Sequence, residues 1–139
     1  WGTTQLRAEY WYGTQTATAV NTETPNALLN EPHYIRQFDA AFFYLVQDIV
    51  NKHHQLVIKY DWYDPNTKVS GAEIGKAGTN LNAADLKYTT LGIGYLYHIN
   101  DNLKLVLWYD RVKNENAALP AFTGDVPDNV FTCRLQFRF

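Results

Sequence analysis

The sequence predicts an all-β protein in which antiparallel strands form part of a transmembrane β-barrel. No apolar run approaches the ~20 residues that a membrane-spanning helix needs, and the longest covers residues 40–46. Apolar and polar residues instead alternate in six segments, as expected when only one strand face meets lipid. Aromatic residues make up 15% of the 139 residues, and their amphipathic rings suit a membrane–water interface.

Each alternating segment has about the ~9–11 residues of a tilted strand that crosses a bilayer. The six expected strands cover residues 4–13, 36–47, 55–64, 88–99, 103–112 and 132–139. The apolar sets of the first three are Leu6, Ala8, Tyr10 and Tyr12; Phe38, Ala40, Phe42, Tyr44 and Val46; and Leu56, Ile58, Tyr60 and Trp62. The apolar sets of the last three are Leu91, Ile93, Tyr95 and Tyr97; Leu103, Leu105, Leu107 and Tyr109; and Cys133, Leu135, Phe137 and Phe139.

The second segment separates its faces less cleanly, because Phe43 and Leu45 lie among the polar set.

The links between segments alternate in length. Residues 13–35, 64–87 and 114–127 are long, polar and rich in Asn, Thr, Gly and Pro, whereas the other two links are short. Long loops on one side and tight turns on the other predict an outer-membrane barrel with extracellular long loops.

Aromatic side chains close both ends of the apolar sets, where headgroups would begin. The expected interface aromatics are Tyr10, Tyr12, Tyr44, Tyr60, Trp62, Tyr95, Tyr97, Tyr109 and Phe137. The last segment ends on Phe139, and this terminal pattern resembles the signal that barrel-assembly machinery reads in outer-membrane proteins. Leu135, Phe137 and Phe139 would carry that signal, while an ordinary edge strand ending in Phe is the alternative.

The other strand face carries the charges and is expected to line a water-filled lumen. Its predicted residues are Arg7, Glu9, Asp39, Lys59, Asp61, Lys104, Asp110, Arg134 and Arg138. For most of them a cross-strand ion pair is the better expectation, with Asp110 or Glu9 as partners of Arg134 and Arg138. The near balance of cations and anions favours a weakly selective pore.

Six strands are too few for a single-chain membrane barrel, which starts at about eight. We therefore expect residues 1–139 to be the C-terminal segment of one barrel domain, with the remaining strands supplied by the same longer chain or by other chains. The stretches KYDWYDPN (59–66), YTTLGIGYLYHINDNLKL (88–105), VKNE (112–115) and DNVFTCRLQFRF (128–139) resemble the end of phosphate-selective porins of the porin O and porin P type. That resemblance implies about sixteen strands, a homotrimer and diffusion of small anions across the outer membrane of a Gram-negative bacterium.

The expected function is a diffusion porin for small hydrophilic solutes, with anions such as phosphate as one candidate class. The alternative is an occluded barrel that anchors or joins an envelope complex, and a soluble sandwich that binds a ligand is a third interpretation. We expect no catalysis, cofactor, metal or nucleic-acid partner, because the net charge is −2 and no nucleophile, base and acid group together. His53 and His54 lack a third metal ligand, and GAEIGKAG lacks the features of a phosphate loop.

Overall fold

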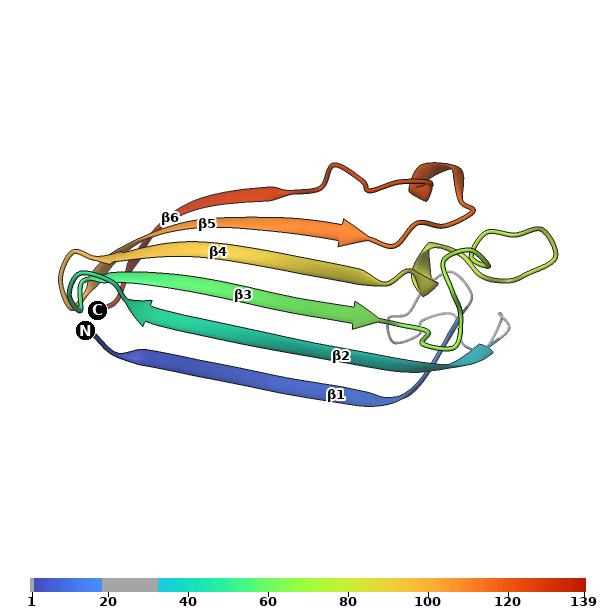
Figure 1. Cartoon of the computed structure of the whole chain (residues 1–139), viewed down its shortest axis with the longest axis horizontal. Helices are drawn as coiled ribbons and strands as arrows, with labels where there is room; N and C mark the ends of the chain where they lie inside the picture. Colours follow the sequence, from blue (N-terminus) through green and yellow to red (C-terminus); the bar gives the residue numbers. More distant parts are fainter. Residues whose placement is uncertain (1, 19–32) are drawn as a thin grey trace.

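A computed structural model describes residues 2–18 and 33–139 and contains one six-stranded antiparallel sheet (Figure 1). The strands are β1 (Thr4–Thr18), β2 (His33–Asp48), β3 (His54–Asp64), β4 (Tyr88–His98), β5 (Leu103–Asn114) and β6 (Val130–Phe137), and each pairs with its neighbours in chain order. Two 3-10 turns, η1 (Ala83–Asp85) and η2 (Pro120–Phe122), interrupt the long connections. The all-β class and the six antiparallel strands are confirmed.

No helix among the described residues has the length and apolar character needed to cross a membrane.

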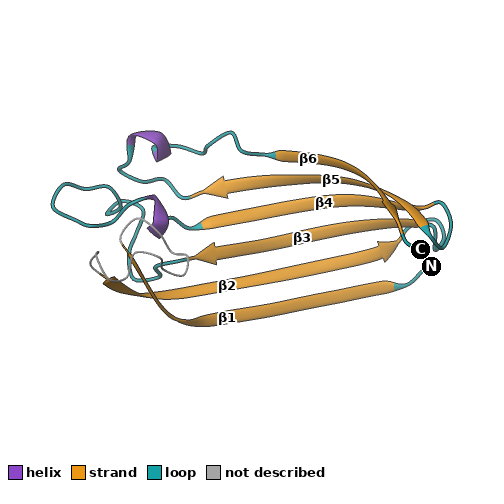
Figure 2. Ribbon diagram, turned by 180° about the vertical axis from the view of Figure 1, so that it is seen from behind, coloured by secondary structure: helices purple, strands orange, loops and turns teal. Residues whose placement is uncertain are grey.

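The two short connections have the same construction. The side chains of Asn51 and Asn100 each accept a hydrogen bond from the backbone N–H two residues later, at 2.8 and 2.9 Å. Asparagine favours such turns because its side chain can replace a backbone partner. Both turns lie at one end of the sheet, and the long connections lie at the other (Figure 2).

The first long link was predicted to cover residues 13–35, but strand pairing continues into it from both sides. Thr14, Gln15 and Thr16 pair with Gln37, Arg36 and Ile35. These positions lack apolar alternation, and β-branched threonine nevertheless favours extended backbone. The remaining part of this predicted loop, 19–32, lies outside the described residues.

The predicted faces of the second strand are wrong. Leu45 of β2 pairs with Leu6 of β1 and with Ile58 of β3, and directly paired residues point to the same side of a sheet. The even-numbered β2 residues therefore lie on the opposite face, namely Phe38, Ala40, Phe42, Tyr44 and Val46. Alternation could not decide this strand because it carries large apolar side chains on both sides.

With this register the sheet has an apolar face and a charged face. The apolar face consists of Leu6, Ala8, Tyr10, Tyr12, Ala41, Phe43, Leu45, Leu56, Ile58, Tyr60, Trp62, Leu91, Ile93, Tyr95, Tyr97, Leu103, Leu105, Leu107, Tyr109, Phe131, Cys133, Leu135 and Phe137. The charged face holds the intervening residues of each strand, among them Arg7, Lys59 and Asp110.

The sheet curls toward its charged face. Tyr44 of β2 and Arg134 of β6 line one hollow of about 350 Å³, although four strand steps separate the two strands. Exposure agrees with this curvature, because Val57 on the charged face is 5% exposed whereas its neighbour Ile58 on the apolar face is 37% exposed. Side chains converge on a concave surface and spread apart on a convex one, so the charged face is the concave side.

Glycine makes room on the concave side for a large ring. The indole of Trp108 in β5 covers Gly94, and a Cβ atom at position 94 would lie 2.1 Å from Trp108 Cε3. Gly92 meets the same ring at 2.7 Å. Two glycines one pleat apart therefore allow Trp108 to lie close to the backbone of β4.

We predict that Gly94→Ala destabilises the fold by about 1–3 kcal/mol, because the added methyl group overpacks the Trp108 contact. Urea unfolding followed by tryptophan fluorescence measures the effect. Gly124→Ala is the matched control and should be nearly silent, since a Cβ there meets nothing within 4 Å. If overpacking is the cause, Gly94→Ala should lower the free energy of unfolding much less in a Trp108→Ala background. Additive effects of the two substitutions would contradict overpacking.

Candidate functional site

The concave face gathers most of the predicted charges. Arg7, Lys59 and Asp110 lie in one row of paired residues that crosses β1 to β5, and Glu9 and Asp61 lie in the next row. Lys104 and Arg134 also fall on this face. Arg138 follows β6 and donates its backbone N–H to the Asn102 carbonyl at 2.8 Å.

Asp39 does not belong to this group, which corrects the prediction. It pairs with Tyr12 of β1 on the apolar face, near the end of the sheet that carries the long connections. Its carboxylate accepts hydrogen bonds from Trp62 Nε1 at 3.1 Å and from the Tyr10 hydroxyl at 3.4 Å. The correction follows from the register of β2, and Asp39 satisfies the polar atoms of Tyr10 and Trp62.

Lys59 connects two acidic residues across the concave face. Its Nζ lies 2.7 Å from Asp61 Oδ2 and 3.7 Å from Asp110 Oδ1. Gly92 pairs with both Lys59 and Asp110 and so stands between them. A Cβ at Gly92 would lie 2.8 Å from Asp110 Oδ1, so a side chain here would separate the cation from this carboxylate.

The remaining charges are available to solvent. Within residues 2–18 and 33–139, the salt bridges do not include Arg7, Glu9, Lys104, Arg134 or Arg138. The expected ion pair between Arg134 and Asp110 is therefore not formed, because Asp110 is turned toward Lys59. The cross-strand interpretation holds for Lys59 with Asp110 and not for the two arginines at the end of the chain.

On the apolar face, the register groups eight of the nine predicted interface aromatics. They are Tyr10, Tyr12, Tyr60, Trp62, Tyr95, Tyr97, Tyr109 and Phe137. Tyr44 is wrong, because it pairs with Arg7 and Lys59 on the charged face. Sequence reasoning missed Phe43 and Phe131 on the apolar face, since the first was given the wrong parity and the second lies just before the predicted last strand.

These aromatics step along the strands in a regular way. Tyr109 of β5 lies in the same row of paired residues as Leu6 of β1. Tyr10, the β1 aromatic compared with Tyr109, lies four residues after Leu6. The level of these aromatics therefore shifts by four residues over four strand steps. The shift runs toward the end with the short turns.

The aromatics at the opposite end of the sheet shift by two residues over two strand steps. The row that contains Tyr97 of β4 reaches β6 at Leu135, and Phe137 lies two residues further toward the short turns. From Tyr10 to Tyr109 and from Tyr97 to Phe137, the aromatics thus move by one residue per strand, whereas Phe131 lies in the same row as Tyr109. A shift of one residue (~3.3 Å) for each strand spacing (~4.8 Å) corresponds to tilted strands. The angle between the strands and the perpendicular to the lines along which the aromatics lie is about 35°.

The long connections 65–87 and 115–129 pack against one another. Ile74, Leu86 and Ala117 are buried and form a small apolar core with Val69, Leu81, Tyr88, Leu119 and Phe122 around it. Glu115 accepts backbone N–H bonds from Gly71 and Lys87 at 3.0 and 2.9 Å. We call this two-loop unit the loop cap. Sequence reasoning did not predict it, because these links carry no periodic apolar pattern.

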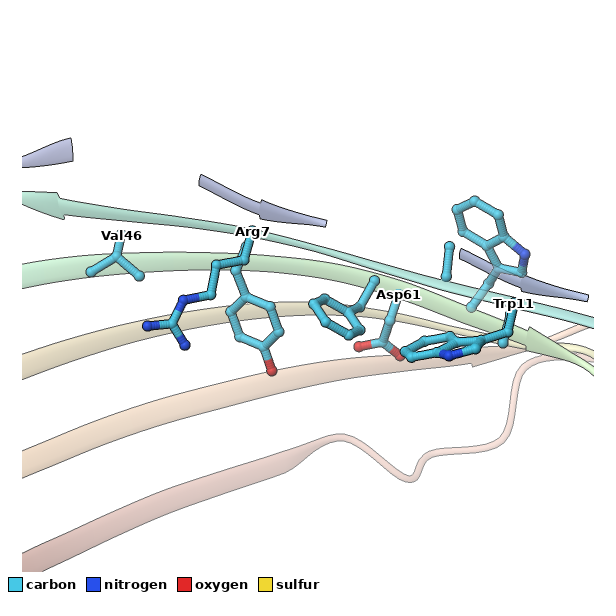
Figure 3. Close-up of a pocket in the computed structure, with 9 residues that line it drawn as sticks. Arg7, Trp11, Val46 and Asp61 are labelled. Atoms are coloured by element: carbon cyan, nitrogen blue, oxygen red, sulfur yellow. The ribbon is translucent and has the colours of Figure 1, made fainter. Parts of the chain in front are cut away.

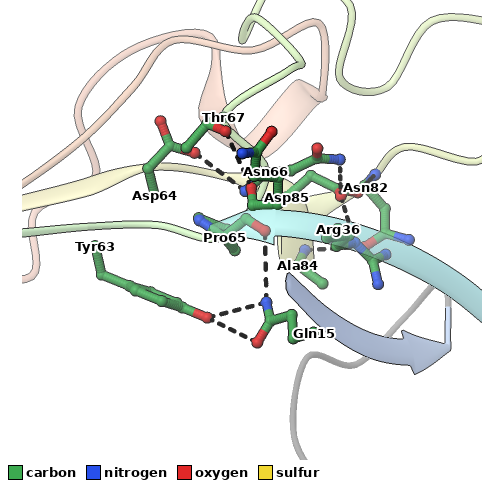
Figure 4. A network of polar contacts seen from close by, with 11 residues as sticks. Gln15, Arg36, Tyr63, Asp64, Pro65, Asn66, Thr67, Asn82, Ala84 and Asp85 are labelled. Atoms are coloured by element: carbon green, nitrogen blue, oxygen red, sulfur yellow. Dashed lines mark hydrogen bonds and ion pairs between the residues drawn. The ribbon is translucent and has the colours of Figure 1, made fainter. Parts of the chain in front are cut away.

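A buried ion pair joins the loop cap to the sheet. Arg36 Nε of β2 lies 2.7 Å from Asp85 Oδ1 in η1, and both side chains are almost fully buried. The Asn66 side chain donates to the same Asp85 oxygen at 2.9 Å, and the Asn82 backbone N–H donates to the other at 3.1 Å (Figure 4). Asp85 thus has hydrogen-bond partners on both oxygens.

At the rim of the loop cap, the backbone N–H and the hydroxyl of Ser70 donate to Glu73 Oε2 at 3.0 and 2.9 Å. The backbone bond, followed by the hydroxyl bond, lowers the pKa of Glu73 below its ordinary value. A lowered carboxyl pKa stabilises the turn above the unfolded pKa, and this contribution is lost as the pH falls through the folded pKa.

Comparisons with known proteins give no match to this chain among family models, curated proteins or solved structures. The resemblance to phosphate-selective porins therefore stays a prediction. Within the described part of the chain, no three His, Cys, Asp or Glu side chains group in a way that could hold a metal ion. The charges, the aromatic rings and the loop cap are the features from which a function can be inferred.

We predict that Arg36→Met loosens the loop cap strongly, because it leaves the buried Asp85 carboxylate without its cation, at a cost of about 3–5 kcal/mol. Amide hydrogen exchange of residues 66–87 measures the local opening free energy. Lys87→Met is the matched control, since the Lys87–Asp64 pair is 3.8 Å long and its lysine is 40% exposed. The control should cost less than about 1 kcal/mol, and equal effects of the two variants would contradict this role of Arg36.

Proposed function

We propose that the chain forms part of the wall of an outer-membrane β-barrel porin that passes small hydrophilic solutes. The observation that carries this proposal is the separation of the sheet into a convex apolar face and a concave charged face. In water a continuous apolar surface across six strands is unfavourable, whereas against acyl chains it is the expected arrangement.

The aromatic stagger supports the same placement. Membrane barrels tilt their strands by about 35–45°, and girdles of aromatic residues mark the two headgroup levels. The two aromatic sets of this sheet each shift by one residue per strand, which corresponds to about 35°. A soluble sheet has no reason to align its aromatics along two parallel tilted levels, so the stagger favours a membrane.

The two edge strands indicate further partners. Among the described residues, β1 pairs with β2 alone and β6 with β5 alone. Unpaired backbone groups in hydrocarbon cost several kcal/mol each, so both edges require additional strands. We propose that these come from the same longer chain or from other chains. The porin O and porin P resemblance makes the homotrimer the assembly to test, with barrel-assembly machinery and outer-membrane lipid as the other partners.

The charged face would then line the lumen. Its strands carry five cations, Arg7, Arg36, Lys59, Lys104 and Arg134, and four anions, Glu9, Asp48, Asp61 and Asp110. Arg36 is buried against Asp85, and Lys59 is held between Asp61 and Asp110. Arg7, Lys104 and Arg134 remain as the cations that can meet a solute. This distribution supports a weak preference for anions such as phosphate rather than strict selectivity.

The loop cap favours a second candidate, an occluded barrel that serves as an anchor or as a partner subunit in an envelope complex. Its buried core and its ion pair give the long connections a fixed shape. A fixed surface at the end of a barrel can bind a partner as readily as it can shape an entrance.

Reconstitution of the complete protein into planar bilayers separates the two candidates. Discrete ohmic current steps with a reversal potential that favours anions are expected for the porin. A protein that inserts and stays silent contradicts the porin and favours the anchor. A protein that remains in solution without detergent contradicts both.

Adjacent residues of β6 give a direct test of the two faces. Cys133 lies on the apolar face and Thr132 on the charged face. In liposomes we expect a charged, water-soluble methanethiosulfonate reagent to leave Cys133 unmodified and to modify Thr132→Cys in a Cys133→Ser background. The measurement is the mass increase of the intact protein. Rapid modification of Cys133 would place this face in water and contradict the proposal.

A further inference from the structure

Three aromatic rings follow one another on the charged face, where a water-filled lumen does not require them. The rings belong to Trp11 of β1 and to Phe42 and Tyr44 of β2. Trp11 pairs with Ala40, and Phe42 and Tyr44 lie on the same face of β2 as Ala40. The ring centroids of Trp11 and Phe42 lie 5.4 Å apart, and those of Phe42 and Tyr44 lie 5.5 Å apart. We call these three residues the aromatic track.

The aromatic track borders a hollow of about 650 Å³. Trp11 is 42% exposed, and Phe42 and Tyr44 are half-buried, so ring surface remains open toward the hollow. Arg7 and Asp61 line the same hollow, and both project with Trp11 to one side of the sheet (Figure 3). A solute in this hollow would meet ring faces and charged hydrogen-bonding groups together.

The charges beside the track are of both signs. Arg7 and Lys59 pair with Tyr44 from its two sides, and Glu9 and Asp61 pair with Phe42 from its two sides. The two cations offer donors and the two carboxylates offer acceptors, and their charges balance. Lys59 Nζ lies 2.7 Å from Asp61 Oδ2, so an anionic solute finds no net positive charge at the track. A neutral solute with many hydroxyl groups can use both kinds of partner.

We propose that the aromatic track binds neutral saccharides during their passage, an inference that rests on the proposed porin function and names a solute class for it. One side of a sugar ring presents mainly C–H groups, which suit the negative face of an aromatic ring. Its hydroxyl groups can donate to Glu9 and Asp61 and accept from Arg7. Successive rings lie 5.4 and 5.5 Å apart and are inclined to one another at 50° and 74°. A saccharide would therefore turn as it moves from one stacking position to the next.

The experiment measures single-channel current of the complete protein in planar bilayers while maltotriose is added to one side. Maltotriose should reduce the current in a concentration-dependent manner. Phe42→Leu keeps an apolar side chain but removes the ring, and it should weaken the block about threefold to tenfold. Phe42→Trp should retain the block, because it keeps an aromatic face in the hollow.

Phe43→Leu is the matched control, since Phe43 follows Phe42 in the chain and lies on the apolar face. It should leave the block unchanged. An open channel that maltotriose does not block, or one in which Phe42→Leu and Phe43→Leu behave alike, overturns the inference and leaves the porin function standing. Stronger block by benzoate than by maltotriose also overturns it and assigns the track to aromatic anions. A protein that conducts no salt overturns the porin function itself.

Discussion

Antiparallel backbone pairing is the constraint on which the rest of this structure depends. Side chains alternate between the two sides of a strand, so the hydrogen-bonded register fixes the face of every residue at once. Leu6, Leu45, Ile58, Ile93 and Tyr109 form one continuous row because each strand pairs with the next in a single register. A shift of one residue in the pairing of one strand would move all of its apolar side chains to the concave face.

The same pairing explains how the concave face holds both ions and rings. Curvature brings side chains from distant strands around shared hollows, and glycine at 92 and 94 supplies the space that Lys59, Asp110 and Trp108 occupy. The charges are thereby divided into a bound set around Lys59 and a set that faces solvent. In the proposed lumen, the first set would hold the wall and the second set would meet solutes.

The loop cap follows a different principle from the sheet. The sheet in itself buries little apolar surface, whereas Ile74, Leu86 and Ala117 are buried within the long connections. The Arg36–Asp85 pair then fastens this small core to β2. The end of the sheet with the long connections is consequently built as a unit with its own packing.

The sequence by itself determined the all-β class, six strands, the short turns and the faces of five strands, because strict alternation leaves one choice of face. The tertiary structure alone decided the face of β2, where Phe42, Phe43, Tyr44 and Leu45 make both choices equally apolar. It also decided the placement of Asp39, the partner of Asp110 and the aromatic track, each of which depends on the neighbouring strands. The loop cap required contacts between residues far apart in the chain, and local periodicity carries no information about such contacts.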